Sequence, residues 1–321
     1  MLAARLRGMT DTTGTVTSPR TDDAQGSTRR IRAAGTAAGA LVALDIDGTL
    51  LKARAAVPEV TVAAVADARR SGHHVVLASG RSLVGVLPVA RQLGIDAGWV
   101  VTSNGAVVAR LDGTRPGGYE LDTVHTFDVE PVIRRARALV PTVQVGVEEI
   151  GWGYRVTSPF EPSSVNGEQR LVPDAELWDV PATRVILRGE GVARLVEPLR
   201  SLGVTPVPAA SDWVDVTPRD LSKATALERV REQVGVDPAR TVAVGDGVND
   251  LEMVAWAARG VAMGHAPAVL RDAADEVTGT IDEHGVVPVL RSLGTTGQGL
   301  AGQEPGQSAA GQRAAGGASQ R

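Results

Sequence analysis

Short apolar runs alternate with longer amphipathic segments along the middle of the chain. Residues 41–46 form a short apolar run, residues 58–71 are alanine-rich and amphipathic, and residues 75–78 are apolar again. This alternation is typical of strand–helix–strand units. Pro58 suits the first turn of the helix, where a missing N–H costs nothing, and Gly72 suits its end.

The same alternation returns in the second half of the chain. Residues 221–234 have the pattern of an amphipathic helix and precede two apolar runs, 241–244 and 261–263. Strands that are apolar throughout are typical of a parallel sheet covered on both faces. We therefore predict an α/β fold whose core is a three-layer, Rossmann-like parallel sheet.

The middle third of the chain has a different pattern. Residues 115–216 contain short hairpin-like runs, proline-containing turns and three of the five tryptophans, so we assign them to an inserted α+β cap. The core is then divided into residues 39–114 and 217–292. Residues 1–38 and 293–321 are small, polar and without hydrophobic periodicity, and we predict disordered tails there.

Composition excludes several classes of function. The 321-residue chain has a formal net charge of -4 and a pI near 5.8, so it lacks the positive field that nucleic acid or an anionic membrane would select. No apolar run reaches the roughly 18 residues that a membrane span requires. The chain has no cysteine, which excludes thiolate metal sites and favours hard cations held by oxygen. This composition fits the cytoplasm, our expected location, without requiring it.

Two aspartates follow the first predicted strand in the string LDIDGTL at residues 44–50. Asp45 and Asp47 are two residues apart, so in an extended chain their side chains project to one side. Gly48 lets the backbone turn sharply and approach an anion. Open α/β sheets bind ligands at the carboxyl ends of their strands, so one carboxylate could attack a bound group while the other transfers protons. A strand end with two solvated aspartates is the less favoured interpretation.

A second acidic string, VGDGVND at residues 244–250, follows another predicted strand. Asp246 and Asp250 add two carboxylates, and four acidic side chains from two strand ends could converge. Such a cluster in an apolar frame needs a cation, and oxygen ligands favour Mg²⁺. Taken alone, the string could be an Asp-Gly turn before a helix, but the first motif makes that interpretation less favourable.

Three further positions could bind an anion. The Ser79 hydroxyl and the backbone N–H groups from Gly80 onward lie where a predicted strand meets a helix, so they could hold phosphoryl oxygens. Asn104, in the string TSNG, is primarily a turn signal. Lys223 begins a predicted helix, and the residues alone favour a surface charge and a site residue equally.

The strings DxDGTL, SGR, SNGA, a lysine and GDGxNDxxM, in this order, resemble the haloacid dehalogenase superfamily. Its Cof-type sugar-phosphate phosphatases fit best, over about residues 41–290. The resemblance implies a Mg²⁺-dependent phosphatase that acts on a small phosphorylated metabolite through an aspartyl-phosphate. It implies neither the physiological substrate nor the oligomeric state.

The resemblance also implies a role for each matching residue. Asp45 would be the nucleophile, and Asp47 would protonate the leaving oxygen and then activate water. Ser79 and Lys223 would hold the phosphoryl oxygens, and Asp250 would either complete the metal shell or orient Lys223. The implied Mg²⁺ ligands are Asp45, the Asp47 backbone carbonyl, Asp246 and Asp250, and the implied substrate contacts are Gly80, Asn104 and Asn249.

One position departs from the Cof-type pattern. His265 stands in the string AMGHA where these proteins usually have asparagine. Beside a carboxylate-rich pocket its ring could add a pH-dependent charge, but we favour a surface turn residue. His73 and His74 precede a strand, and we expect both to be exposed.

Other functions remain open at this point. A phosphomutase of the phosphomannomutase kind would share the nucleophile and the general acid. A non-catalytic binder of phosphorylated ligands would have no need of Asp47. P-type pumps contain a similar GDGVND string, but they have membrane spans and a threonine at the position of Asp47. The aromatic residues Trp152, Tyr154 and Trp178 of the predicted cap are assigned to its core rather than to substrate contacts.

Overall fold

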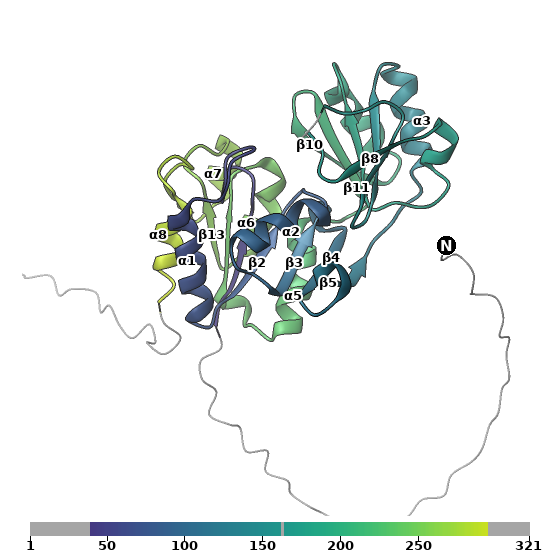
Figure 1. Ribbon diagram of the computed structural model, residues 1–321. Helices are drawn as coiled ribbons and strands as arrows, with labels where there is room; N and C mark the ends of the chain where they lie inside the picture. The colour runs from purple at the N-terminus through teal and green to yellow at the C-terminus, as the bar shows by residue number, and fades with distance from the viewer. Residues whose placement is uncertain (1–38, 162–163, 295–321) are drawn as a thin grey trace, which may run out of the picture. The chain divides into compact units, whose positions relative to one another are not determined.

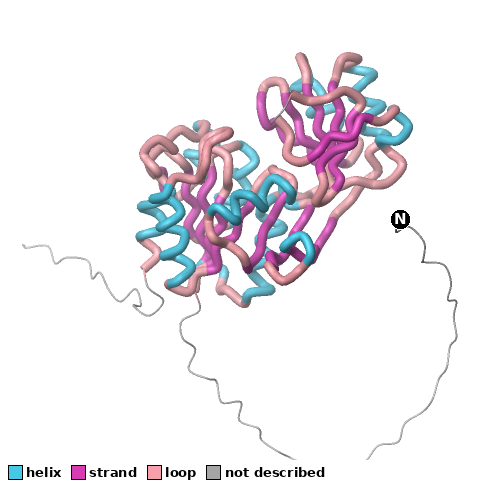
Figure 2. Tube along the Cα trace, viewed as in Figure 1, coloured by secondary structure: helices cyan, strands magenta, loops and turns pink. Residues whose placement is uncertain are grey.

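The computed structural model describes residues 39–161 and 164–294 (Figure 1). The tails expected at 1–38 and 293–321 lie outside the described residues, except for Leu293 and Gly294. Figure 2 shows the described strands in magenta, and they form one sheet of eight strands and one of six. None of the described helices is long and apolar enough to cross a membrane.

The eight-stranded sheet has the order β14-β13-β12-β1-β2-β3-β4-β5. The strands from β14 to β3 are parallel, whereas β4 and β5 are antiparallel to their neighbours. The predicted α/β class is therefore confirmed, with an antiparallel hairpin added at one edge. The strands are β1 (Leu41–Leu44), β2 (His74–Ala78), β3 (Ala97–Thr102), β4 (Val107–Asp112), β5 (Tyr119–Val124), β12 (Thr241–Gly245), β13 (Arg259–Ala262) and β14 (Glu276–Val277).

Helices cover both faces of this sheet. Val42 and Leu44 share a buried cluster with residues of α1, α2 and α8, whereas Leu41 and Ala43 share another with residues of α5 and α6. Successive side chains of a strand point to opposite faces, so the core has three layers. The helices are α1 (Glu59–Arg70), α2 (Leu83–Gln92), α5 (Lys223–Val234), α6 (Leu251–Trp256), α7 (Ala268–Ala273) and α8 (Val286–Arg291), with short helical turns η1 (Ser103–Gly105), η2 (Pro116–Gly118), η5 (Pro238–Arg240) and η6 (Val248–Asp250).

The six-stranded sheet lies between β5 and α5 in the chain and has the order β10-β11-β9-β6-β7-β8. Its pairs are antiparallel except β7 with β8. Residues of α3 and α4 contribute to one buried cluster of this segment. Tyr154 and Ile186 belong to another, against which the partly buried Trp213 packs. The elements are α3 (Glu130–Leu139), β6 (Gln144–Glu149), β7 (Gly153–Val156), β8 (Glu168–Leu171), η3 (Asp174–Leu177), β9 (Val185–Arg188), η4 (Val192–Leu195), α4 (Val196–Arg200), β10 (Val204–Ala210) and β11 (Trp213–Pro218).

The two sheets divide the chain slightly later than the expected boundaries of residues 115–216. The strand β5 pairs with β4 in the first sheet, so the turn-rich stretch before Tyr119 is a hairpin loop. At the other end, β11 continues to Pro218. The function of the six-stranded segment as a cap stays a prediction.

His73 was wrongly expected to be exposed. Its side chain is buried, and its Nδ1 accepts a hydrogen bond from the Ala40 N–H at 3.0 Å. The polar ring thus satisfies a backbone donor just before β1, whereas the neighbouring His74 is exposed as expected.

Candidate active site

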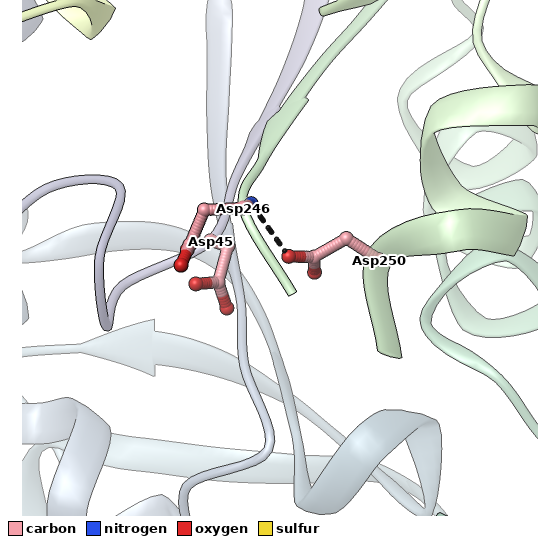
Figure 3. Close-up of side chains that lie close together, drawn as sticks. All are labelled: Asp45, Asp246 and Asp250. Carbon is pink, nitrogen blue, oxygen red and sulfur yellow. Dashed lines mark hydrogen bonds between the residues drawn. The ribbon is translucent and has the colours of Figure 1, made fainter. Parts of the chain in front are cut away.

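Three of the predicted site carboxylates lie together at the carboxyl ends of β1 and β12. Asp45 follows β1, Asp246 follows β12 and Asp250 ends η6. Each offers an oxygen atom within 4.8 Å of those of the other two, as the close-up shows (Figure 3). The cause is strand pairing, because β1 and β12 are parallel neighbours and the Asp45 N–H extends the ladder to the Val244 carbonyl at 3.0 Å.

Lys223 lies within this group and not on the surface. Its side chain is fully buried, and its Nζ donates to Oδ1 of Asp45 and Oδ1 of Asp250, both at 2.6 Å. Burial favours a lower pKa for Lys223, but Asp250 and Asp45 outweigh it and raise the pKa. The side chain is therefore a charged ammonium between two carboxylates.

The start of α5 fixes the position of Lys223. The Ser222 hydroxyl accepts from the Thr225 N–H at 3.3 Å, and the Thr225 hydroxyl accepts from the Ser222 N–H at 3.1 Å. This reciprocal capping box marks the start of the helix, with Ser222 as the N-cap directly before Lys223. Gly105 allows η1 to approach this cap, because it has a φ of +101° and a Cβ there would lie 2.2 Å from the Ser222 carbonyl oxygen.

Asp250 supports both Lys223 and the loop that carries Asp246. Its Oδ1 accepts from Lys223, and its Oδ2 accepts from the N–H groups of Asp246 and Gly247, both at 2.9 Å. Figure 3 shows the bond to Asp246 as a dashed line. With both oxygens engaged in this way, the geometry favours the orienting role over the role of a metal ligand.

Asp246 is held from the other side by the loop after β1. The Thr49 hydroxyl donates to Oδ1 of Asp246 at 3.0 Å. Gly48 has a φ of +84°, and a Cβ at this position would lie 2.1 Å from Oδ2 of Asp246. Only glycine combines this backbone conformation with such a close approach.

The carboxylates fit a bound cation. Burial raises the pKa of Asp45 well above its usual value, Asp250 adds to this, and Lys223 opposes it. Burial and Asp250 likewise raise the pKa of Asp246 to about 6. Lys223 supplies one positive charge to the three carboxylates, so negative charge within this group of described residues stays uncompensated. Because all the donors are carboxylate oxygens, the group suits a hard divalent metal.

Asp47 lies outside the three-carboxylate group. Its side chain is half exposed, and its two oxygens accept from Nε and Nη2 of Arg81 at 2.7 and 2.6 Å. The pairing of β1 with β2 brings these two strand ends together. The sequence contained Arg81 only as part of the SGR string, with no sign of this contact, and metal binding by the Asp47 backbone carbonyl stays a prediction.

The remaining predicted residues line one cavity. The buried Ser79 hydroxyl accepts from the Arg81 N–H at 3.2 Å. Asn249 donates to Oδ1 of Asn104 at 3.1 Å, and a Cβ at Gly80 would lie 3.0 Å from the same oxygen. The cavity measures about 590 Å³, the size of a small-metabolite site, and its lining also includes Asp45, Asp47 and Asp246.

Residues of the six-stranded segment also line this cavity, among them Tyr154, Arg184 and Asp215. The sequence pattern assigned Tyr154 to a core and singled out neither of the other two. Tyr154 is buried, but its hydroxyl accepts a hydrogen bond from Nη2 of Arg184. A sequence signal did exist, because a charged residue beside or within an apolar strand is costly unless it is paired. Arg184 precedes the run VIL, and Asp215 lies within WVDV.

His265 is a surface turn residue, as predicted, but its side chain also contacts the acidic group. Its Nε2 lies 3.6 Å from Oδ2 of Asp246, and its Nδ1 accepts from the Ile281 N–H at 3.3 Å. The side chain is nevertheless one-third exposed and lies in a turn. Burial dominates the pKa of Asp246, and His265 opposes that rise.

Comparison with known proteins identifies the family. The sequence model described as haloacid dehalogenase-like hydrolase matches residues 42–116 and 194–290, which is more than half of the chain. The chain belongs to this family. The Bacillus subtilis protein YkrA is 30% identical to this hydrolase over 268 residues, covering 79% of this chain and 97% of YkrA.

Two further relatives have named activities. The 5-amino-6-(5-phospho-D-ribitylamino)uracil phosphatase YitU of Bacillus subtilis is 26% identical, with 78% of this chain and 96% of YitU covered. The solved structure of the subclass IIB sugar phosphatase BT4131 has a TM-score of 0.67 and 26% identity, with 79% of this chain and 98% of that chain covered. These matches confirm the resemblance to Cof-type phosphatases. This haloacid dehalogenase-like hydrolase is a phosphoric monoester hydrolase.

Proposed function

We propose that this haloacid dehalogenase-like hydrolase removes phosphate from a small phosphorylated metabolite through an aspartyl-phosphate on Asp45, with Mg²⁺ as its cofactor. The observation that carries the proposal is the buried convergence of Asp45, Asp246 and Asp250, with Lys223 bonded to two of them. A cytoplasmic location and the absence of a nucleic-acid partner belong to the same proposal and rest on composition.

The nucleophile and the proton donor lie on one loop. An Asp45 carboxylate oxygen attacks phosphorus, the bond from phosphorus to the leaving oxygen breaks, and Asp47 gives a proton to that oxygen. Asp47 then takes a proton from water as the water oxygen attacks the same phosphorus. The bond between phosphorus and Asp45 breaks, which releases inorganic phosphate and restores both carboxyl groups.

Charge neutralisation is the main requirement of this reaction. A carboxylate and a phosphate oxygen repel each other by about 4 kcal/mol per pair of unit charges at 4 Å and an effective dielectric of 20. Lys223 reduces this repulsion, and the Ser79 hydroxyl and nearby backbone N–H groups bind phosphoryl oxygens. A bound Mg²⁺, held by Asp45, Asp246 and the Asp47 carbonyl, would supply further positive charge.

Arg81 must release Asp47 before proton transfer. Both Asp47 oxygens accept hydrogen bonds from the guanidinium in this structure. A phosphoryl group beside Ser79 offers Arg81 another anion within the same cavity. Substrate binding would therefore free Asp47 to face the leaving oxygen.

The experiment compares Asp45→Asn with the wild-type enzyme. Phosphate release is measured from p-nitrophenyl phosphate, a sugar-phosphate panel and 5-amino-6-(5-phospho-D-ribitylamino)uracil, with Mg²⁺ or with EDTA. We expect Mg²⁺-dependent turnover that Asp45→Asn abolishes. The exposed Asp282, which pairs with Lys52, provides the control Asp282→Asn, whose turnover should equal that of the wild type.

Four outcomes would contradict the proposal. Turnover in EDTA would exclude the metal requirement, and a fully active Asp45→Asn variant would exclude the aspartyl-phosphate. A folded wild-type protein that binds these esters without hydrolysing them would favour the binder. A requirement for added bisphosphorylated sugar would favour the phosphomutase.

A further inference from the structure

Two consecutive non-glycine residues after β3 have left-handed backbone. The φ angles of Ser103 and Asn104 are 51° and 53°. Residues with a Cβ rarely adopt this conformation, and it persists only where the surroundings hold it in place. Such strain often marks a functional segment, so the groups that hold these two residues are informative.

Two carboxylates of the six-stranded sheet hold this pair. The Ser103 hydroxyl lies 2.8 and 2.7 Å from the two oxygens of Glu148, to which it donates. Nδ2 of Asn104 donates to Oδ2 of Asp215 at 3.3 Å. Glu148 is in β6 and Asp215 is in β11, so two strands of the inserted segment contact one turn of the first sheet.

One guanidinium joins both carboxylates. Nε of Arg184 lies 3.2 Å from Oε2 of Glu148, and Nη1 lies 3.2 Å from Oδ2 of Asp215. Nη1 also donates to the backbone carbonyl of Gly80. The side chains of all three charged residues are at most 7% exposed, so water does not weaken these contacts as it weakens surface ion pairs.

The Gly80 carbonyl lies in the segment that would bind the phosphoryl group. Backbone hydrogen bonds tie this segment to the strained pair, since the Ser103 N–H donates to the Arg81 carbonyl at 2.8 Å and the Asn104 N–H donates to the Ser79 carbonyl at 3.1 Å. Residues 79–81 and the turn after β3 are therefore one hydrogen-bonded unit.

We propose that Arg184 is a positioning residue for phosphoryl transfer. It binds the Gly80 carbonyl directly and holds Ser103 and Asn104 through Glu148 and Asp215, which fixes residues 79–81 in the conformation that binds the phosphoryl oxygens. Arg184 acts on this segment and not on the reacting atoms. The inference rests on the proposed function, because it takes residues 79–81 as the phosphoryl-binding segment.

The chain offers a matched control for Arg184. Arg155 in β7 is also 4% exposed, and it too pairs with a carboxylate, Glu149, and donates to a backbone carbonyl, that of Glu176. These two partners lie within the inserted segment, whereas the Gly80 carbonyl belongs to the first sheet's loops. Replacing either arginine by methionine removes one buried charge of similar surroundings.

The experiment measures kcat and KM for p-nitrophenyl phosphate, inhibition by orthovanadate and the thermal midpoint of each variant. Both Arg184→Met and Arg155→Met should lower the midpoint. Only Arg184→Met should lower kcat, by up to roughly a hundredfold, the loss that a misplacement of about 1 Å can cause. Arg184→Met should also weaken inhibition by orthovanadate. Arg184→Lys keeps the charge but loses the planar guanidinium, so it should restore only part of kcat.

Equal kcat values in the two methionine variants would overturn the inference. If Arg184→Met does not fold, Ser103→Ala tests the inference instead, because Ser103→Ala removes only the hydrogen bond to Glu148. It should lower kcat, while Ser201→Ala, at an exposed serine bonded to the Pro198 carbonyl, should not. Equal activity of these two serine variants would also overturn it. A folded wild-type enzyme without turnover would instead refute the proposed function, so the two failures are distinct.

Discussion

Replacement of Asp246 by asparagine tests the electrostatics of the acidic group. Burial and Asp250 raise the pKa of Asp246 from 3.8 to about 6. A carboxyl whose folded pKa is raised stabilises the fold below its unfolded pKa, and that contribution is lost as the pH rises through about 6. This rise in pKa corresponds to about 3 kcal/mol of stability, of which about 2 kcal/mol is lost between pH 4.5 and pH 8.

The substitution removes this titration and keeps an oxygen that can accept from Thr49. In EDTA, the free energy of unfolding of Asp246→Asn, relative to the wild type, should therefore increase by about 2 kcal/mol between pH 4.5 and pH 8. Urea denaturation followed by tryptophan fluorescence at the two pH values measures it. Added Mg²⁺ should stabilise the wild type at pH 8 more than the variant, because the variant lacks a ligand.

Asp282→Asn serves as a control for the direction in which stability changes with pH. Lys52 lowers the pKa of Asp282, so this carboxylate stabilises the fold above its unfolded pKa and loses that contribution as the pH falls. The Asp282 variant should therefore lose stability relative to the wild type as the pH rises toward the unfolded pKa of 3.8, and the difference should change little between pH 4.5 and pH 8. A stability difference between Asp246→Asn and the wild type that is constant with pH, or that grows in favour of the variant toward pH 4.5, would refute the reasoning.

Two further substitutions test the positions of single atoms. Lys223→Met should lower kcat by about 10²- to 10³-fold, the loss that follows removal of one transition-state donor, because Nζ lies 2.6 Å from Asp45. The control Lys52→Met, at an exposed lysine, should keep the wild-type kcat. Equal steady-state rates for the two variants would contradict the role of Lys223. Gly48→Ala should lower the thermal midpoint and weaken Mg²⁺ binding in calorimetry, because its φ is +84° and the added Cβ would lie 2.1 Å from Asp246. Unchanged values of both would show that the loop accommodates a side chain.

Much of the fold was predictable because its signals are local. The helix expected at residues 58–71 is α1, with Pro58 at its N-cap and Gly72, at a φ of +86°, directly after its C-cap Ser71. The apolar runs became strands of one sheet, since alternate faces of β1 are both buried. The sequence pattern placed β5 within the cap range of residues 115–216, because a turn-rich stretch looks alike within a hairpin and between domains, whereas the structure pairs β5 with β4 in the first sheet.

The residues of the candidate site also fall into those that the sequence predicted and those that it did not. Asp45 and Asp246 could be placed at strand ends from sequence, because residue type, glycine spacing and the end of an apolar run are all local properties. Lys223 could not be distinguished from a surface lysine, because its burial depends on two carboxylates from distant segments. The burial of His73 and the contact of His265 with Asp246 also depend on segments distant in the chain.

The sequence by itself determined the α/β class, the strand ends that carry chemistry and the family of the enzyme. Tertiary structure alone decided that Arg81 binds Asp47 and that Arg184 joins Glu148, Asp215 and the Gly80 carbonyl. Periodicity and turn signals report interactions within a few residues along the chain. Ion pairs between residues 30 or more positions apart in the sequence depend on strand register and on which side chains are buried from water. Register and burial are set only in the assembled fold.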